Sequence, residues 1–469
     1  VPGSEGNLSV ENPATGEHLA WQASAGTDDV DQAVAAARAC VDEGRLTAIP
    51  PVERGRMVRK IGEILLDQID EIAPVLTLES GKPLWEARIE VEGTARYFEY
   101  YGNQAETLEG RSIPIGQGYM DFTVYEPYGV SAQIIPWNYP LEMTARSLST
   151  ALVTGNACVV KTPELDPLSN SYIAMAAEQA GWPKGAVNIL CGTGPLAGAH
   201  LAGHQGINQL VFTGSVATGI SVAQRAAANL VPSVLELGGK SAAIICPDAD
   251  LDTVLSNIRW GIFFNAGQVC SAMSRVIVHE DLHDRLLEGI TDLASGLSVG
   301  PGIDRPEFGP NMGAMISGAQ RDRAGRLCRE AETEGARLVT GGHAPNRPGF
   351  FMQPTVFADV APDSAIAQTE VFGPVLSMFK YRDLEQAIAI TNQSEYGLVG
   401  GVFGNDLDGA MDVAGRLQVG QVFVNEWYAG GVAAPFGGYK KSGYGREKGR
   451  EALLNYVQTK NIAIKYGSS

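Results

Sequence analysis

One cysteine and one glutamate in this chain are of the residue types that covalent catalysis needs. Cys270 closes the stretch Phe263-Phe-Asn-Ala-Gly-Gln-Val-Cys270, where its neighbours are mostly small or apolar. Glu236 lies 34 residues upstream, in Leu235-Glu236-Leu-Gly-Gly-Lys240. A thiolate is a strong nucleophile, and a nearby carboxylate can serve as its general base. The alternative is a core thiol beside an ordinary glycine turn, since a lone cysteine is usually a small buried hydrophobe.

An asparagine between two prolines supplies a third candidate group. The stretch Ile134-Ile-Pro136-Trp137-Asn138-Tyr-Pro140 places Asn138 in a braced loop. A side-chain amide held in such a loop can donate a hydrogen bond to an oxyanion. The alternative is a rigid loop whose tryptophan and asparagine only pack.

Three predicted strands end in residues that suit a nucleotide. Lys161 and Glu164 follow strand 157–160, and a donor and an acceptor there can bind two ribose hydroxyls. Gly194 lies in a GxGxxxG turn after strand 187–190. Gly214 and Ser215 follow strand 209–212 and open a helix, where glycine permits close approach and serine can cap the helix and contact a phosphate. These features suggest dinucleotide binding, and the alternative is ordinary turn glycines with a surface lysine and glutamate.

The elements that would position these residues follow a strand–helix alternation. Residues 28–110 are predicted to be helical, and two strands broken at Pro127 follow in 119–136. From 137 to 245, strands alternate with predicted helices 143–153, 169–180, 195–203 and 217–228. This alternation predicts an α/β fold with a doubly wound parallel sheet, which binds ligands at the carboxyl ends of its strands.

A second strand–helix series is predicted between residues 245 and 440. Its helices are expected at 250–265, 281–296, 316–335, 383–392 and 407–417, and its strands at 274–279, 337–340, 376–380 and 421–424. The tail, 460–465, alternates like a strand. It is expected to pair either with another subunit's sheet edge or with its own domain.

Composition limits the partners of the chain. Its 469 residues are too many for one core, and its formal net charge of -18 disfavours nucleic acid and anionic membranes. No run approaches the roughly 20 apolar residues of a membrane helix. Six scattered cysteines without a CxxC pattern suggest a reducing cytoplasm. His200 and His204 lack the glutamate of a zinc-protease helix, so no metal site is expected.

Together these stretches resemble the aldehyde dehydrogenase superfamily. The resemblance covers roughly residues 10–467, and seven motifs occur in the family's order. They are Pro-Trp137-Asn138-Tyr-Pro, Lys161-x-x-Glu164, Phe212-Thr-Gly214-Ser215, Glu236-Leu-Gly-Gly-Lys, Gly267-Gln-Val-Cys270, Glu370-Val-Phe372-Gly-Pro and Pro435-Phe436-Gly-Gly-Tyr-Lys-Lys-Ser-Gly.

The resemblance implies a three-part subunit with a Rossmann-type nucleotide-binding domain. That domain would comprise residues 1–111 and 129–238, and the catalytic domain residues 239–440. A small β flap, residues 112–128 and 455–469, would mediate a homodimer or homotetramer.

The resemblance also implies a mechanism. Cys270 would attack an aldehyde, the Cys270 N–H and Asn138 would hold the oxyanion, and Glu236 would activate the water that hydrolyses the thioester. The implied cofactor is NAD. Its implied contacts are Ile134, Trp137, Lys161, Glu164, Gly194, Phe212, Gly214, Ser215, Leu237, Glu370 and Phe372.

Two residues sharpen the implied reaction. Relatives that transfer the acyl group to coenzyme A lack the base at Glu236, so hydrolysis to the free acid is favoured over a CoA-acylating enzyme. The charge of Glu164 would repel a 2′-phosphate, which favours NAD over NADP. A non-catalytic structural relative is a further alternative, and the intact Cys270 and Asn138 argue against it.

The substrate is expected to be an aromatic or carboxylate-bearing aldehyde. Arg146 occupies a position where some relatives bind a substrate anion, and an internal salt bridge to Glu142 is the alternative. Relatives that oxidise succinic semialdehyde usually carry a second arginine at the position of Phe264, which argues against that substrate. The expected tunnel is partly aromatic, and its residues are Met143, Phe264, Val269, Trp427, Tyr428 and Phe436.

Overall fold

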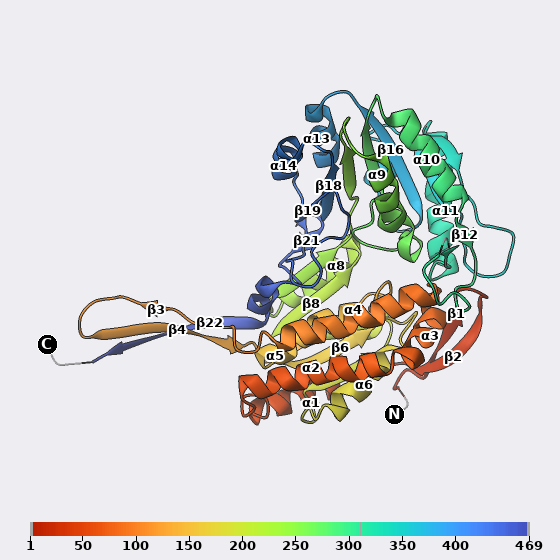
Figure 1. Ribbon diagram of the computed structural model, residues 1–469. Helices are drawn as coiled ribbons and strands as arrows, with labels where there is room; N and C mark the ends of the chain where they lie inside the picture. The colour runs from red at the N-terminus through yellow and green to blue at the C-terminus, as the bar shows by residue number, and fades with distance from the viewer. Residues whose placement is uncertain (1–2, 310, 467–469) are drawn as a thin grey trace.

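The computed structural model of the chain describes residues 3–309 and 311–466. The chain forms two lobes, each built around its own sheet, and an arm of long strands projects from one of them (Figure 1). Both sheets are largely parallel and alternate with helices, in agreement with the predicted α/β class. Within the described residues, no helix is both long and apolar enough to cross a membrane.

The first lobe contains a six-stranded sheet with the order β21-β9-β8-β5-β6-β7. Its five long strands run parallel, and each is an apolar run because both faces of the sheet are covered. The strands are β5 (Val130–Ile134), β6 (Ala157–Thr162), β7 (Val187–Cys191), β8 (Gln209–Gly214) and β9 (Ser233–Leu237), with β21 (Gly443–Tyr444) antiparallel at the edge.

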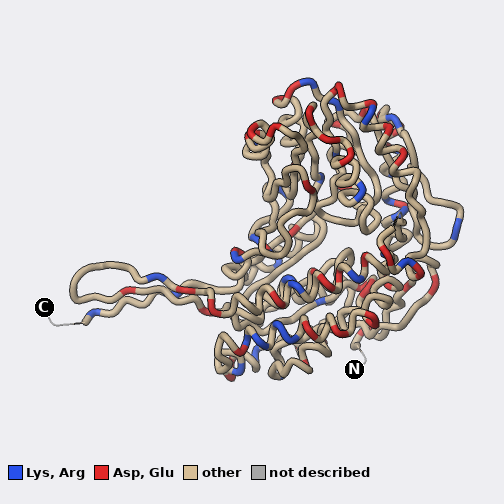
Figure 2. The backbone as a smooth tube through the Cα atoms, viewed as in Figure 1, with Lys and Arg blue, Asp and Glu red and all other residues tan. Residues whose placement is uncertain are grey.

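The helices of the first lobe bury one apolar stripe each against this sheet or against one another. In α1, Val30, Val34 and Ala37 recur at helical spacing and are fully buried. The helices are α1 (Thr27–Asp42), α2 (Pro51–Asp67), α3 (Ile69–Ser80), α4 (Leu84–Gly102), α5 (Pro140–Thr154), α6 (Asn170–Gln179), α7 (Ala199–Ala202) and α8 (Val216–Ala227). Acidic and basic residues are interspersed along α2 and α4 on the outer face (Figure 2).

The second lobe contains a seven-stranded sheet with the order β14-β15-β16-β11-β10-β18-β19, in which only β14 is antiparallel. The strands are β10 (Ala242–Ile245), β11 (Arg275–His279), β14 (Arg337–Thr340), β15 (Thr355–Ala358), β16 (Val375–Tyr381), β18 (Val399–Phe403) and β19 (Gln421–Val424). Its helices are α9 (Leu251–Ile258), α10 (His283–Ser295), α11 (Gly318–Thr333), α12 (Ala365–Gln368), α13 (Leu384–Asn392) and α14 (Leu407–Arg416).

The arm is a three-stranded sheet made of β3 (Ser112–Ile113), β4 (Tyr119–Pro127) and β22 (Val457–Lys465). All nine residues of β22 pair with β4 of the same chain, so the tail strand is paired within its own subunit. The flap predicted from 112–128 and the tail corresponds to this arm, except that 467–469 lie outside the described residues (Figure 1).

Several elements differ from the sequence-based predictions. The helix expected at 250–265 ends at Ile258 and continues as a π-helical turn, because Asn265 and Ala266 adopt left-handed φ angles of 50°. Strand β18 was not predicted because Gly400 and Gly401 are poor strand formers. An added Cβ at Gly401 would lie 2.6 Å from Trp427, which explains the glycine. Other unpredicted strands are β9, β15 and the N-terminal hairpin of β1 (Asn7–Asn12) and β2 (Glu17–Ala23).

Candidate active site

A cavity of about 1030 Å³ lies between the two lobes and collects most of the residues singled out from the sequence. Cys270, Glu236 and Asn138 all line it. So do Trp137, Gly214, Ser215, Glu370 and Phe372 of the expected cofactor set, and Arg146, Met143, Val269 and Phe436 of the expected substrate set. Ile134, Lys161, Glu164, Gly194, Phe212 and Leu237 lie outside its lining.

A tightly constrained turn presents Cys270 to the cavity. The preceding Gly267 has a φ of 72°, and an added Cβ there would lie 2.2 Å from the carbonyl oxygen of Gly373. Only glycine fits this close approach without strain. Burial raises the pKa of the Cys270 thiol to about 12, so the group is a neutral thiol at physiological pH. It therefore needs a base to become a nucleophile.

Glu236 is the candidate for that base, and no described residue competes for its carboxyl group. It lies one residue before the end of β9, and both its carboxylate oxygens are buried without a hydrogen bond from any described residue. Burial raises its pKa well above the ordinary value, and the nearby Arg146 guanidinium opposes that shift. An unsatisfied buried carboxyl facing a cavity is costly unless a ligand or water completes it.

Asn138 is held on both sides of its peptide. Its Nδ2 donates to the carbonyl oxygen of Gln268 at 3.0 Å. Its backbone carbonyl accepts from Lys82 Nζ at 3.0 Å and from Asn265 Nδ2 at 2.9 Å. Lys82 is itself fully buried and paired with Glu90. One Asn138 amide hydrogen remains to donate into the cavity, and the network orients it.

Sequence reasoning missed this supporting network. Lys82 and Glu90 stand in a long helical region where charged residues normally face solvent, so no local pattern marks them as buried. Asn265 lies in the cysteine stretch itself, and its residue type was the available signal, since asparagine tolerates the left-handed φ found there better than most residues.

The expected nucleotide contacts line up along the carboxyl edge of the first sheet. Ile134 is in register with both Lys161 and Phe212, and Gly214 with Leu237. Ile134, Phe212 and Leu237 are buried, so their side chains shape this edge from the core. Parallel strands bring their carboxyl ends to one side, which is where doubly wound sheets bind ligands.

Two features on this edge offer polar groups to a ligand. Lys161 Nζ lies 2.7 Å from Glu164 Oε2, and the N–H of Gly194 donates to Glu164 Oε1 at 3.4 Å. Ser215 caps α8, accepting from the N–H of Thr218 at 3.4 Å, and lines the cavity. The pair of Lys161 and Glu164 can hold hydroxyl groups, and the N-terminus of α8 can hold a phosphate.

The second lobe contributes Glu370 and Phe372 from the opposite wall. Glu370 Oε1 accepts the Gly239 N–H at 3.0 Å, and burial raises its pKa to about 7. Phe372 has a φ of 56° and meets Trp137 edge to face at 5.2 Å. The two walls thus contact each other across the cavity.

Arg146 is engaged by the protein itself. Its Nε lies 2.5 Å from Glu447 Oε2, and its Nη2 donates to Thr213 Oγ1 at 3.1 Å. The expected internal partner, Glu142, is not the one found, because the chain near the C-terminus folds back over α5 and brings Glu447 to the guanidinium. Both side chains of the pair are buried, at 3% and 2% exposure, so removing one of them would leave the other as an uncompensated buried charge.

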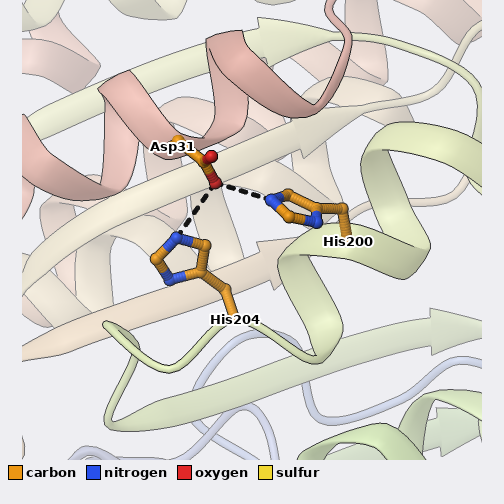
Figure 3. Close-up of side chains that lie close together, drawn as sticks. All are labelled: Asp31, His200 and His204. Carbon is orange, nitrogen blue, oxygen red and sulfur yellow. Dashed lines mark hydrogen bonds and ion pairs between the residues drawn. The ribbon is translucent and has the colours of Figure 1, made fainter.

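Asp31, His200 and His204 cluster on the surface of the first lobe (Figure 3). Asp31 Oδ1 lies 2.6 Å from His200 Nε2 and 3.2 Å from His204 Nε2. The Nδ1 of His204 accepts the Gly206 N–H at 2.8 Å, so the proton of a neutral ring sits on Nε2. A protonated Nε2 donates to Asp31, so in this structure the three side chains form a hydrogen-bonded surface contact.

Comparison with known proteins places the whole chain in one family. Residues 1–462 match the family described as "Aldehyde dehydrogenase family". The mitochondrial benzaldehyde dehydrogenase of Antirrhinum majus is 40% identical over 453 residues, covering 96% of this chain and 84% of that protein.

Solved structures agree at the level of the fold. The NAD+ complex of an aldehyde dehydrogenase from Bacillus cereus has a TM-score of 0.97 at 36% identity, covering 99% of this chain and 94% of that one. The complex of PnpE from Pseudomonas sp. WBC-3 with nicotinamide adenine dinucleotide also has a TM-score of 0.97 at 36% identity, covering 100% and 96%. On the whole-chain match and these identities, the chain belongs to the aldehyde dehydrogenase family.

Proposed function

We propose that this enzyme oxidises an aldehyde to the carboxylic acid, with NAD as hydride acceptor and Cys270 as nucleophile. The observation that carries the proposal is the meeting of Cys270, Glu236 and Asn138 in one cavity between the lobes. The three groups match the roles of nucleophile, base and oxyanion donor.

The residues divide the chemistry as follows. Glu236 takes the thiol proton of Cys270, and the sulfur adds to the aldehyde carbon to give a thiohemiacetal. Asn138 Nδ2 and the Cys270 N–H donate to the developing oxyanion. When bound, NAD accepts the hydride that leaves the carbon. Glu236 loses the thiol proton to solvent and then takes a proton from water, which attacks the thioester; the acid leaves, and the proton returns from Glu236 to the sulfur of Cys270.

The chain's own groups fit NAD. Ser215 and the N-terminus of α8 would hold the pyrophosphate, and Lys161 with Glu164 the adenosine ribose. Gly238 leaves room for Glu370, since a Cβ there would lie 2.1 Å from the carboxylate; Glu370 and Phe372 would hold the nicotinamide half. Two structural neighbours are complexes with this cofactor, which supports the assignment.

The unpartnered Glu236 favours hydrolysis over transfer of the acyl group to coenzyme A. A buried carboxylate that lacks a hydrogen-bond partner among the described residues is free to orient a water molecule. A CoA-acylating enzyme would need no base at this position.

An aromatic aldehyde suits the substrate side of the cavity. Phe264, Trp260, Tyr428 and Phe436 line it together with Met143 and Val269. The 40% identical benzaldehyde dehydrogenase is consistent with an aryl substrate. The pairing of Arg146 with Glu447 argues against the expected role of Arg146 as the anion-binding residue.

Three further assignments belong to this proposal. Residues 1–111 and 129–238 form the NAD-binding domain, residues 239–440 the catalytic domain, and the arm the contact of a homodimer or homotetramer. Each of the two proposed domains has its own buried core, which supports the division. The six free cysteines suit a reducing cytoplasm.

The test is NADH formation from benzaldehyde, followed by absorbance. Cys270→Ala is expected to lose turnover by at least about 1000-fold while still binding NAD, because the nucleophile is gone and the cofactor contacts remain. Cys328→Ala, a buried cysteine outside the cavity, is the matched control and should keep its activity. Full activity of Cys270→Ala would overturn the assignment.

A further inference from the structure

Three cationic side chains line the cavity within the described part of the chain: Arg146, Arg323 and Lys448. Arg146 is paired with Glu447. Arg323 donates to the carbonyl oxygens of Glu370 and Val371 at 2.8 and 2.7 Å on the cofactor side. Lys448 makes no hydrogen bond or ion pair with any residue that the structure describes, so its charge is the one left for a ligand.

The backbone holds Lys448 in a conformation that lysine does not favour. Its φ is 64°, in the left-handed region, where a side chain with a Cβ is strained. Glu447 and Phe436 exchange both backbone hydrogen bonds at 2.7 Å, and the Gly449 N–H donates to the Val432 carbonyl at 2.9 Å. The residues on both sides are therefore anchored, and the strained position aims the side chain.

The Lys448 ammonium is partly buried in the cavity wall and rests against one aromatic ring. Its Nζ lies 5.5 Å from the centre of the Phe436 ring, a cation–π contact. Burial lowers the pKa of Lys448, and the charge of Glu142, which lines the same cavity, opposes that shift without forming an ion pair. A charge in such surroundings is only partly compensated, and an anionic ligand would compensate it fully.

We propose that Lys448 binds an anionic oxygen, carboxylate or phenolate, carried by the aldehyde at a distance from the carbon that Cys270 attacks. This inference rests on the proposed function, because it concerns the substrate of the same cavity. It keeps the anionic substrate expected from the sequence and moves its recognition from Arg146 to Lys448.

The charges of the cavity wall support a selective role for Lys448. The carboxyl groups of Glu142, Glu236 and Glu426 line the same cavity and cannot attract an anion, so Lys448 is the group there that can offset the charge of an anionic substrate. One ammonium with rotatable donors on a flexible stem can meet a carboxylate or a phenolate at several depths. Lys448 thus sets the preference for charged over neutral aldehydes.

The experiment compares kcat/KM for benzaldehyde and for two of its anionic derivatives, which carry the charge at opposite ends of the ring. The substrates are benzaldehyde, 4-carboxybenzaldehyde and salicylaldehyde, the last above the pKa of its phenol. In Lys448→Met, the ratio of anionic to neutral kcat/KM should fall at least about tenfold, because the counterion is lost. Lys448→Arg keeps the charge and should retain most of the ratio. Lys441→Met, an exposed lysine paired with Glu395 outside the cavity, is the matched control.

The two anionic substrates identify which anion Lys448 binds. A fall confined to 4-carboxybenzaldehyde assigns a carboxylate, and a fall confined to salicylaldehyde assigns a phenolate. An unchanged ratio in Lys448→Met for both, with wild-type activity on benzaldehyde, overturns the inference and leaves the proposed function intact. If wild type oxidises none of the three aldehydes, the proposed function fails instead.

Discussion

At the scale of single residues, burial raises the pKa of both the candidate nucleophile and the candidate base. The pKa of the Cys270 thiol is raised to about 12, and the pKa of Glu236 is also raised, in both cases mainly by desolvation. Each group alone holds its proton more firmly than in water. Arg146 favours the charged form of both groups, while its own charge is paired with Glu447. One arginine fixed by Glu447 can therefore favour an anion on either group.

The raised pKa of Glu236 predicts the pH dependence of thioester hydrolysis. Only the ionised carboxylate accepts a proton, so the deacylation rate should rise with pH through a range above that of an ordinary glutamate. The measurement is the steady-state rate after the NADH burst at several pH values. Glu236→Gln should still show a burst, although acylation is slower without the base, because hydrolysis is slowed further, at least about 100-fold, and becomes flat with pH. An identical rising limb in Glu236→Gln would remove Glu236 from this role.

Glu164 carries the prediction on cofactor choice. Burial opposes its ionisation, but Lys161 and hydrogen bonds outweigh that effect and lower the pKa of Glu164, so it is charged at neutral pH. A carboxylate here repels a 2′-phosphate. In Glu164→Gln, the preference for NAD over NADP in kcat/KM should fall about tenfold, equivalent to ~1.4 kcal/mol. An unchanged preference would assign the discrimination to another group.

At the scale of elements, α4 and the turn before it support two catalytic loops at once. Lys82 donates to the carbonyl of Asn138, and Glu86 accepts the Asn265 N–H at 3.0 Å. The loop of Asn138, the candidate oxyanion donor, and the turn that ends at Cys270 therefore share one buried support. Buried charges of this kind are costly to expose singly, so the support is rigid.

The buried Glu86 on α4 predicts how stability changes with pH. Burial raises its pKa from 4.5 to about 8. The folded protein therefore binds more protons than the unfolded chain between these values, so this contribution is present below pH 4.5 and is lost as pH rises through 8. Between pH 5 and 8, the Tm of wild type should fall by about 2–4 °C more than that of Glu86→Gln, measured by thermal unfolding. Parallel Tm profiles would contradict the assigned pKa.

At the scale of the whole molecule, the arm leaves the body of its own subunit. Cross-strand partners Met120 and Ile464 are 53% and 42% exposed near its tip. Exposed apolar pairs on a projecting strand are typical of a contact with another chain. This fits the proposed oligomer better than a free monomer.

The arm therefore predicts the size of the assembly. In the double variant Met120→Glu/Ile464→Glu, a contact made by the arm would have to bury two carboxylates, which is costly. The variant should therefore form a smaller assembly than wild type, measured by light scattering after size exclusion. Leu407→Glu, on exposed α14 of the other lobe, is the control and should leave the mass unchanged. If wild type, the double variant and Leu407→Glu all have the same mass, the contact between subunits lies elsewhere.

Local pattern predicted most helices and strands to within a few residues, because apolar periodicity follows directly from burial. It missed β18, where packing against Trp427 demands glycine, and the break in the helix expected at 250–265, where a π-helical turn to Phe263 is followed by left-handed Asn265 and Ala266. It also missed Lys82 and Lys448, since a lysine in sequence carries no mark of being enclosed.

The sequence by itself determined the alternating architecture, the family, and the identities of Cys270, Glu236 and Asn138 as candidates. These depend on residue type and order along the chain. Only the tertiary structure decided which charges are free, because pairing depends on segments hundreds of residues apart. Glu447 reaches Arg146 from near the C-terminus and satisfies it, and its neighbour Lys448 is left facing the cavity. Partial burial strengthens the effect of the unpaired Lys448 charge, since charges interact strongly in surroundings of low polarity.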